Sequence, residues 1–89
     1  MITRTLTISN KLGLHARAAS LFVKTASSFG ADIQVRNEVN TANGKSIMSV
    51  MMLQAAFGTE IELTVNGDDE TLALDALTDL VNNKFGEAE

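Results

Sequence analysis

The chain has 89 residues, which is room for one domain over residues 1–89, and it contains no cysteine and a single histidine. These counts exclude a disulfide scaffold, a cysteine nucleophile and a metal site made of thiolates or several histidines, so we expect neither a metal nor another cofactor. The formal net charge of −4 argues against a general nucleic-acid binder.

The sequence also lacks the signals of export and of membrane insertion. Its longest uncharged run, residues 46–58, is too short and too interrupted to span a bilayer. Residues 1–9 do not resemble a secretory signal. We therefore expect a soluble, cytoplasmic protein that does not insert into membranes. Separately, we expect the chain to be a monomer.

Charge is distributed unevenly along the chain. Residues 1–31 contain four basic and no acidic side chains, whereas residues 68–89 contain seven acidic side chains and one lysine. Such an asymmetry marks either a directional interaction surface or a solvated helix face. The basic segment and the acidic segment lie at opposite ends of the chain. The charge distribution alone leaves both interpretations open.

The first half of the chain predicts a strand, a helix and a hairpin. Residues 2–8 alternate apolar and polar side chains, which is typical of a half-buried strand. Residues 16–29 have helical spacing, and Gly30 stands where a C-cap belongs. A second alternating region points Ile33, Val35 and Val39 inward, turns at residues 37–38 and returns as a short strand at residues 40–42. The predicted buried face of the helix is Ala19, Phe22, Val23, Ala26 and Phe29.

The second half predicts a short helix, a strand and a long helix. Ser46 is the expected N-cap of a helix over residues 47–53, where consecutive Met51 and Met52 cannot both point inward. Residues 60–65 alternate cleanly and predict a strand. Asp68 or Asp69 is expected to cap the last helix and Gly86 to close it. The predicted buried stripe of this helix is Leu72, Ala73, Ala76, Leu77, Leu80 and Val81.

The resulting order is β-α-β-β-α-β-α. Strand pairs separated by helices indicate a mostly antiparallel sheet with helices covering one face, because alternating strands leave the other face polar. The predicted fold class is therefore α+β.

His15 is the first candidate for chemistry. It lies at or beside the N-terminus of the helix over residues 16–29, where unpaired backbone N–H groups and the helix dipole stabilise anions. Arg17 follows two residues later, and its planar guanidinium suits phosphate oxygens. A neutral imidazole is a competent nucleophile, but no carboxylate lies close in sequence to orient it. The alternative is a surface histidine without a function.

Gly44-Lys45-Ser46 is the second candidate. It resembles the end of a phosphate-binding loop, but Val39 occupies the position where that motif requires a glycine. Phosphorylation of Ser46 makes better physical sense, since a helix N-terminus tolerates the added charge. A simple helix cap after a turn is the alternative. The methionines of the following segment suit a core, but one or two of them could equally be exposed, where their flexibility suits contact with several partners.

The two motifs together resemble a known family. Gly13-Leu14-His15-Ala16-Arg17-Ala18-Ala19 and Gly44-Lys45-Ser46-Ile47-Met48-Ser49-Val50-Met51-Met52-Leu53 are similar to the matching motifs of HPr, the histidine-containing phosphocarrier of the bacterial sugar phosphotransferase system. The resemblance covers the whole chain. It implies an open-faced β-sandwich, in which a four-stranded antiparallel sheet is covered on one face by three helices.

The resemblance also implies a function. His15 would be phosphorylated on Nδ1 by phospho-Enzyme I, which draws on phosphoenolpyruvate, and would pass the group to IIA domains of sugar transporters. Arg17 would contact the phosphate. Ser46 would match the regulatory serine that an HPr kinase/phosphorylase modifies in many bacteria. The chain would then be a substrate of enzymes and no enzyme itself. The partner-binding residues would be Ala16, Ala19, Ser20, Lys24, Ile47, Met48 and Met51.

One residue departs from the family pattern. The family usually has proline where this chain has Ala18, so we expect a less rigid first helical turn. The departure keeps open a nitrogen-related phosphocarrier of the NPr type. A regulatory switch, in which modification of His15 or Ser46 changes a protein interface, is the alternative from a different functional class.

Overall fold

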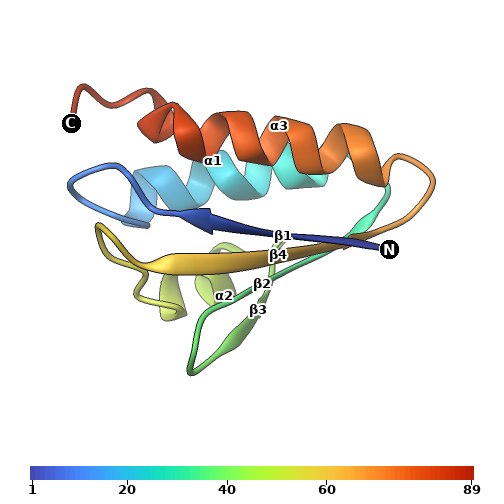
Figure 1. Ribbon diagram of the computed structural model, residues 1–89, viewed down its shortest axis with the longest axis horizontal. Coiled ribbons are helices and arrows are strands. Elements are labelled where there is room, and N and C mark those ends of the chain that lie inside the picture. The colour runs from blue at the N-terminus through green and yellow to red at the C-terminus, as the bar shows by residue number, and fades with distance from the viewer.

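The computed structural model describes residues 1–89, with the helices packed against one side of a single sheet (Figure 1). The order of elements is the predicted one, followed by a short 3-10 turn. The elements are β1 (Ile2–Thr7), α1 (Ala16–Ser27), β2 (Asp32–Arg36), β3 (Thr41–Asn43), α2 (Ile47–Met52), β4 (Glu60–Asn66), α3 (Glu70–Asn82) and η1 (Lys84–Gly86).

The sheet is antiparallel throughout and has the strand order β1-β4-β2-β3. β4 lies in the centre, where Val65 pairs with Ile2 of β1 and Leu63 pairs with Val35 of β2. Buried and solvent-accessible positions alternate along β2 and β4, so one sheet face meets the helices and the other is polar. The structure confirms the predicted α+β fold with its four-stranded open-faced sheet.

Between the sheet and the helices lies one hydrophobic core of 22 buried residues. Phe22 of α1 and Phe85 of η1 are its largest side chains. Two predicted inward positions are wrong. Val39 is 82% exposed because it lies in the connection between β2 and β3, and Leu72 is 67% exposed. In α3 the helical spacing buries Leu74 in place of Leu72, on one face with Leu77 and Val81.

Three helix ends also differ from the predictions. α3 ends at Asn82 and its C-cap is Asn83, so Gly86 does not close it. α1 ends at Ser27 and its C-cap is Ser28, so Gly30 does not cap it. Asp69 occupies the N-cap position of α3, but its carboxylate does not cap that helix. It accepts hydrogen bonds from the backbone N–H groups of Gly30 and Ala31, both at 2.9 Å, and so joins the end of α1 to the start of α3.

None of the helices has the length and apolar character that crossing a bilayer requires. Likewise, no group of three or more histidine, cysteine, aspartate or glutamate side chains is arranged to hold a metal ion.

Candidate functional site around His15

His15 is the N-cap residue of α1 and has an extended backbone, with φ −74° and ψ 177°. The loop before it is fixed by Gly13, whose φ is +68°. A Cβ on this glycine would lie 2.5 Å from the carbonyl oxygen of Ala55, so any larger residue would push the two loops apart. The N–H of Leu14 donates to that same carbonyl at 2.9 Å. The loop after α2 therefore holds the histidine loop in place.

The first turn of α1 offers free hydrogen-bond donors. The first backbone bond of this turn runs from the N–H of Ala19 to the carbonyl of His15, at 2.8 Å. The N–H groups of Ala16, Arg17 and Ala18 have no partner, and the His15 side chain does not cap them. Such donors, together with the helix dipole, stabilise an anion at this end of the helix.

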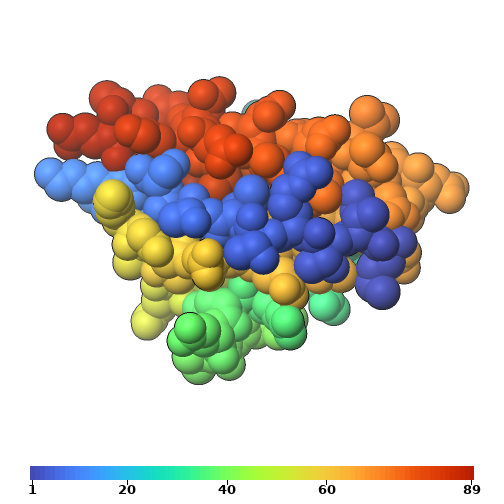
Figure 2. All heavy atoms as spheres, in the orientation of Figure 1, coloured from blue at the N-terminus to red at the C-terminus, as the bar shows by residue number.

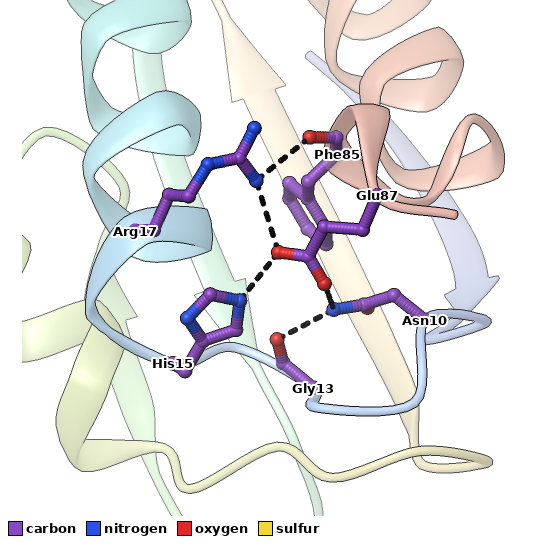
Figure 3. A network of polar contacts seen from close by, with 6 residues as sticks. All are labelled: Asn10, Gly13, His15, Arg17, Phe85 and Glu87. Carbon is purple, nitrogen blue, oxygen red and sulfur yellow. Dashed lines mark hydrogen bonds and ion pairs between the residues drawn. The ribbon is translucent and has the colours of Figure 1, made fainter. Parts of the chain in front are cut away.

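The side chain of His15 contacts a carboxylate from the far end of the chain (Figure 3). Its Nε2 lies 2.5 Å from Oε2 of Glu87, and Arg17 Nη1 donates to the same oxygen at 3.0 Å. Arg17 Nη1 also donates to the carbonyl of Phe85 at 3.2 Å. The His15 side chain is 29% exposed and that of Glu87 is 15% exposed. His15, Arg17 and Glu87 thus form one partly exposed polar cluster.

Asn10 connects this cluster to the protein interior. It is fully buried, and its Nδ2 donates to the carbonyl of Gly13 at 2.8 Å and to Glu87 Oε1 at 3.0 Å. The bond from Asn10 is the main cause that lowers the pKa of Glu87 below its ordinary value. The hydrogen bond from His15 and the positive charge of Arg17 act in the same direction, and burial opposes them. Glu87 is therefore held as a carboxylate.

The C-terminal segment, residues 84–89, is anchored beside the histidine loop. Phe85 is 1% exposed and adopts the left-handed region at φ 55°, which turns the chain toward α1. The N–H of Lys11 donates to the carbonyl of Glu89, and Figure 2 shows the red C-terminal residues against the light-blue segment. The acidic end of the chain is therefore not remote from the basic N-terminal third. The carboxylate partner that the sequence around His15 lacks comes from this segment. It could not be predicted from the sequence because Glu87 lies 72 positions from His15.

Ser46 lies at the start of the other candidate helix. It is the N-cap of α2, as predicted, and its hydroxyl accepts a hydrogen bond from the N–H of Ser49 at 3.3 Å. Lys45 does not face an anion site. Its Nζ donates to the carbonyl of Phe29, just beyond α1, at 2.8 Å. The Gly-Lys-Ser motif thus joins α1 to the start of α2.

Comparison with known proteins identifies the family. Residues 2–83 match the family model described as the HPr component phosphorylation site of the phosphotransferase system. The chain belongs to the HPr family. It is 53% identical to the phosphocarrier protein HPr of Neisseria meningitidis serogroup A over 89 residues, which are the full length of both chains. HPr proteins are phosphocarriers of the bacterial phosphotransferase system.

Solved HPr structures have the same fold. HPr-C-His from Thermoanaerobacter tengcongensis is 47% identical, and the match covers 100% of both chains with a TM-score of 0.96. An HPr dimer from the same organism is 48% identical, with a TM-score of 0.78 over 98% of this chain and 100% of that one. The likeness extends through the C-terminal segment that carries Glu87.

Most of the partner-binding residues predicted for this HPr-family chain are accessible. Met48 is 71% exposed, Ile47 42% and Met51 37%. The α1 residues Ala16, Ser20 and Lys24 are also exposed, and α1 packs against α2. We call these six residues the α1–α2 surface. The prediction that Ala19 binds partners is wrong, because Ala19 is fully buried and packs in the core. The apolar side chains of Leu12, Met52 and Phe57 are exposed as well.

Proposed function

We propose that this chain is a phosphocarrier that accepts a phosphoryl group on His15 from phospho-Enzyme I and passes it to IIA domains of sugar transporters. The observation that carries the proposal is the position of the single histidine. It is accessible at the start of α1, beside three unpaired N–H groups and the guanidinium of Arg17. That arrangement provides a nucleophile together with donors for the oxygens of a transferred phosphoryl group.

The transfer requires one bond to form and one to break. The lone pair on Nδ1 of His15 attacks phosphorus, and the bond between phosphorus and the donor breaks with its electrons returning to the donor. Arg17 and the N–H groups at the start of α1 bind the phosphoryl oxygens during this exchange. Transfer to a IIA domain repeats the same step with the acceptor as nucleophile.

A phosphocarrier must stabilise its phosphoryl group only moderately, so that the group can be transferred onward. Arg17 is more than half exposed, and an ion pair at such a site contributes only ~0–1 kcal/mol. A buried and fully satisfied phosphate site would retain the group. The partly exposed His15 also allows two partners to reach the same atom in turn. We propose that the chain does so as a monomer in the cytoplasm.

The α1–α2 surface is the proposed docking site for Enzyme I and IIA domains. Its methionines have flexible, polarizable side chains that adapt to different partners. Lys24 supplies positive charge on the same helix as Arg17, which favours acidic partner surfaces. Ser46 precedes this surface directly, so its phosphorylation by an HPr kinase/phosphorylase is the proposed regulatory event.

The test uses Enzyme I and labelled phosphoenolpyruvate. The wild-type chain is expected to acquire one acid-labile, base-stable phosphate, and His15→Ala is expected to acquire none. Gln34→Ala, on the uncovered face of the sheet, is the matched control and should label normally. Label that persists in His15→Ala would overturn the assignment. A chase with unlabelled IIA protein separates a carrier from a switch, because the label moves on only from a carrier.

A further inference from the structure

The acceptor histidine has one ring nitrogen engaged and one free. Nε2 contacts the carboxylate of Glu87, while the second ring nitrogen faces away from Glu87 (Figure 3). A histidine used twice in every transfer cycle must present the same nitrogen each time. What holds the ring therefore bears directly on the reaction.

The contacts of Glu87 determine where the ring proton lies. Its two oxygens face Asn10 Nδ2, Arg17 Nη1 and His15 Nε2, and the first two of these groups are donors only. A carboxylate accepts hydrogen bonds and donates none. His15 Nε2 must therefore carry a hydrogen to bond with it, and in the neutral ring Nδ1 then keeps its lone pair.

We propose that Glu87 is a positioning residue for phosphoryl transfer, which holds the proton of His15 on Nε2 and thereby keeps Nδ1 as the nucleophile. This inference rests on the proposed role of His15. It concerns a residue 72 positions away in the chain, which lies outside the two motifs that indicate the family.

The same contact stabilises the product of the transfer. When Nδ1 forms its bond to phosphorus, the ring becomes a cation with its hydrogen still on Nε2. The carboxylate of Glu87 lies against that hydrogen and offsets the positive charge, as a carboxylate does for a catalytic imidazolium. No proton has to leave the ring, and the donor recovers the electron pair of the broken bond.

The structure holds Glu87 in this place with several contacts. Phe85 is inserted in the core two residues earlier, and buried Asn10 binds the second carboxylate oxygen. Arg17 also binds the carbonyl of Phe85. These contacts restrict both ends of the Glu87 side chain, so the carboxylate is preorganised before any phosphoryl donor arrives.

Nitrogen NMR of the unphosphorylated protein tests the first half of the proposal without any transfer reaction. At about pH 8, the neutral ring is expected to be predominantly the Nε2–H tautomer. Glu87→Gln is expected to raise the Nδ1–H share at least about twofold, because an amide has one acceptor oxygen for three donors. Glu89→Gln removes the same charge two residues later, from a carboxylate that pairs with Lys11 at the surface, and should leave the tautomers unchanged.

Transfer kinetics test the second half. Glu87→Gln is expected to accept phosphate from Enzyme I about tenfold more slowly, the lower end of what a hydrogen bond to a charged group contributes. Glu87→Asp keeps the charge at a shorter reach and should recover part of the rate, whereas Glu89→Gln should match the wild type. Glutamine still accepts the bond from Asn10, and thermal unfolding verifies that the variants are folded.

The outcomes separate this inference from the proposed function. If His15 is labelled but Glu87→Gln matches the wild type in tautomer and rate, Glu87 has no positioning role and the carrier function stands. If His15 is never labelled, the carrier function fails, and the NMR experiment still reports whether Glu87 sets the tautomer. An unchanged tautomer in a folded Glu87→Gln protein overturns the inference in either case.

Discussion

Two helix starts in this molecule carry the candidate phosphorylation sites, and they are built differently. At α1 the N-cap residue is His15, which leaves the first-turn N–H groups free and turns its ring to Glu87. At α2 the N-cap residue is Ser46, whose hydroxyl binds the N–H of Ser49. The first site is open to an anion, while the second is already capped by the residue that would be modified. A helix N-terminus therefore becomes an anion site only when its cap residue leaves the donors unused.

The neighbouring cations differ in the same way. Arg17 is 56% exposed and shares the Oε2 atom of Glu87 with His15, so Arg17 can exchange partners. Lys45 is bound to the carbonyl of Phe29. We expect the open site to exchange phosphate rapidly and the capped site to act through the charge that it adds. The predictions below test this difference, beginning with the largest expected effect.

Removal of the exchangeable cation should affect the His15 site most. Arg17→Ala is expected to slow phosphoryl transfer from Enzyme I on the order of 10- to 100-fold, because hydrogen bonds to charged groups contribute about 1.5–3 kcal/mol. Arg17→Lys should keep part of the rate, since lysine retains the charge and loses the planar fork. Rapid-quench labelling measures both. A rate for Arg17→Ala within about twofold of the wild type would contradict the role of the guanidinium.

Addition of charge at the capped helix start should act on docking. Ser46→Asp is expected to weaken binding to Enzyme I about tenfold at low salt, with the effect fading as salt screens the charge. Aspartate caps a helix as well as serine does, so α2 should stay intact. Ser46→Asn is the matched control, because it keeps the cap without the charge. Equal affinities of Ser46→Asp and Ser46→Asn at low salt would remove the electrostatic explanation.

Removal of the cap itself should affect stability and leave the His15 chemistry alone. Ser46→Ala is expected to lower the free energy of unfolding by about 1 kcal/mol, since the N–H of Ser49 loses its acceptor. In a domain of this size that corresponds to a decrease in Tm of about 4–8 °C. Ser49→Ala makes the same chemical change one turn later without removing a cap. A Tm for Ser46→Ala no lower than that of Ser49→Ala would show that the cap contributes nothing.

The smallest effect concerns acid pH and the His15 site. Because folding lowers the pKa of Glu87 below its ordinary value of 4.5, ionised Glu87 stabilises the folded state above that pH. The contribution disappears as pH falls through the lowered folded-state pKa. The Tm of the wild type should therefore exceed that of Glu87→Gln near neutral pH and converge with it in acid. A difference that stays constant from pH 6 down to about pH 2 would show that the carboxylate is not held as the structure indicates.

Much of the fold could be predicted from local pattern. The alternation in β4 and the helical spacing in α1 fixed element types, and Ser46 marked the start of α2 correctly. The wrong predictions concern positions where two residues fit the local pattern equally well and tertiary packing determines which one is buried or caps a helix. Leu72 and Leu74 both suit a helical stripe, and only the packing of α3 against the sheet and α1 buries Leu74. Gly30 is a residue type typical of a C-cap, but the C-cap of α1 is Ser28, and the N–H of Gly30 donates to Asp69, which precedes α3.

The candidate site likewise has features that the local sequence predicts and features that depend on tertiary packing. By itself the sequence determined that the only histidine stands at a helix start with an arginine two residues on, because both facts depend on neighbouring positions. Only the tertiary structure decided which nitrogen of that histidine is free. Buried Phe85 returns the acidic C-terminal segment to the loop before α1, and Glu87 then meets His15 across 72 positions of chain. A contact of that kind depends on how the core closes, and no local pattern records it.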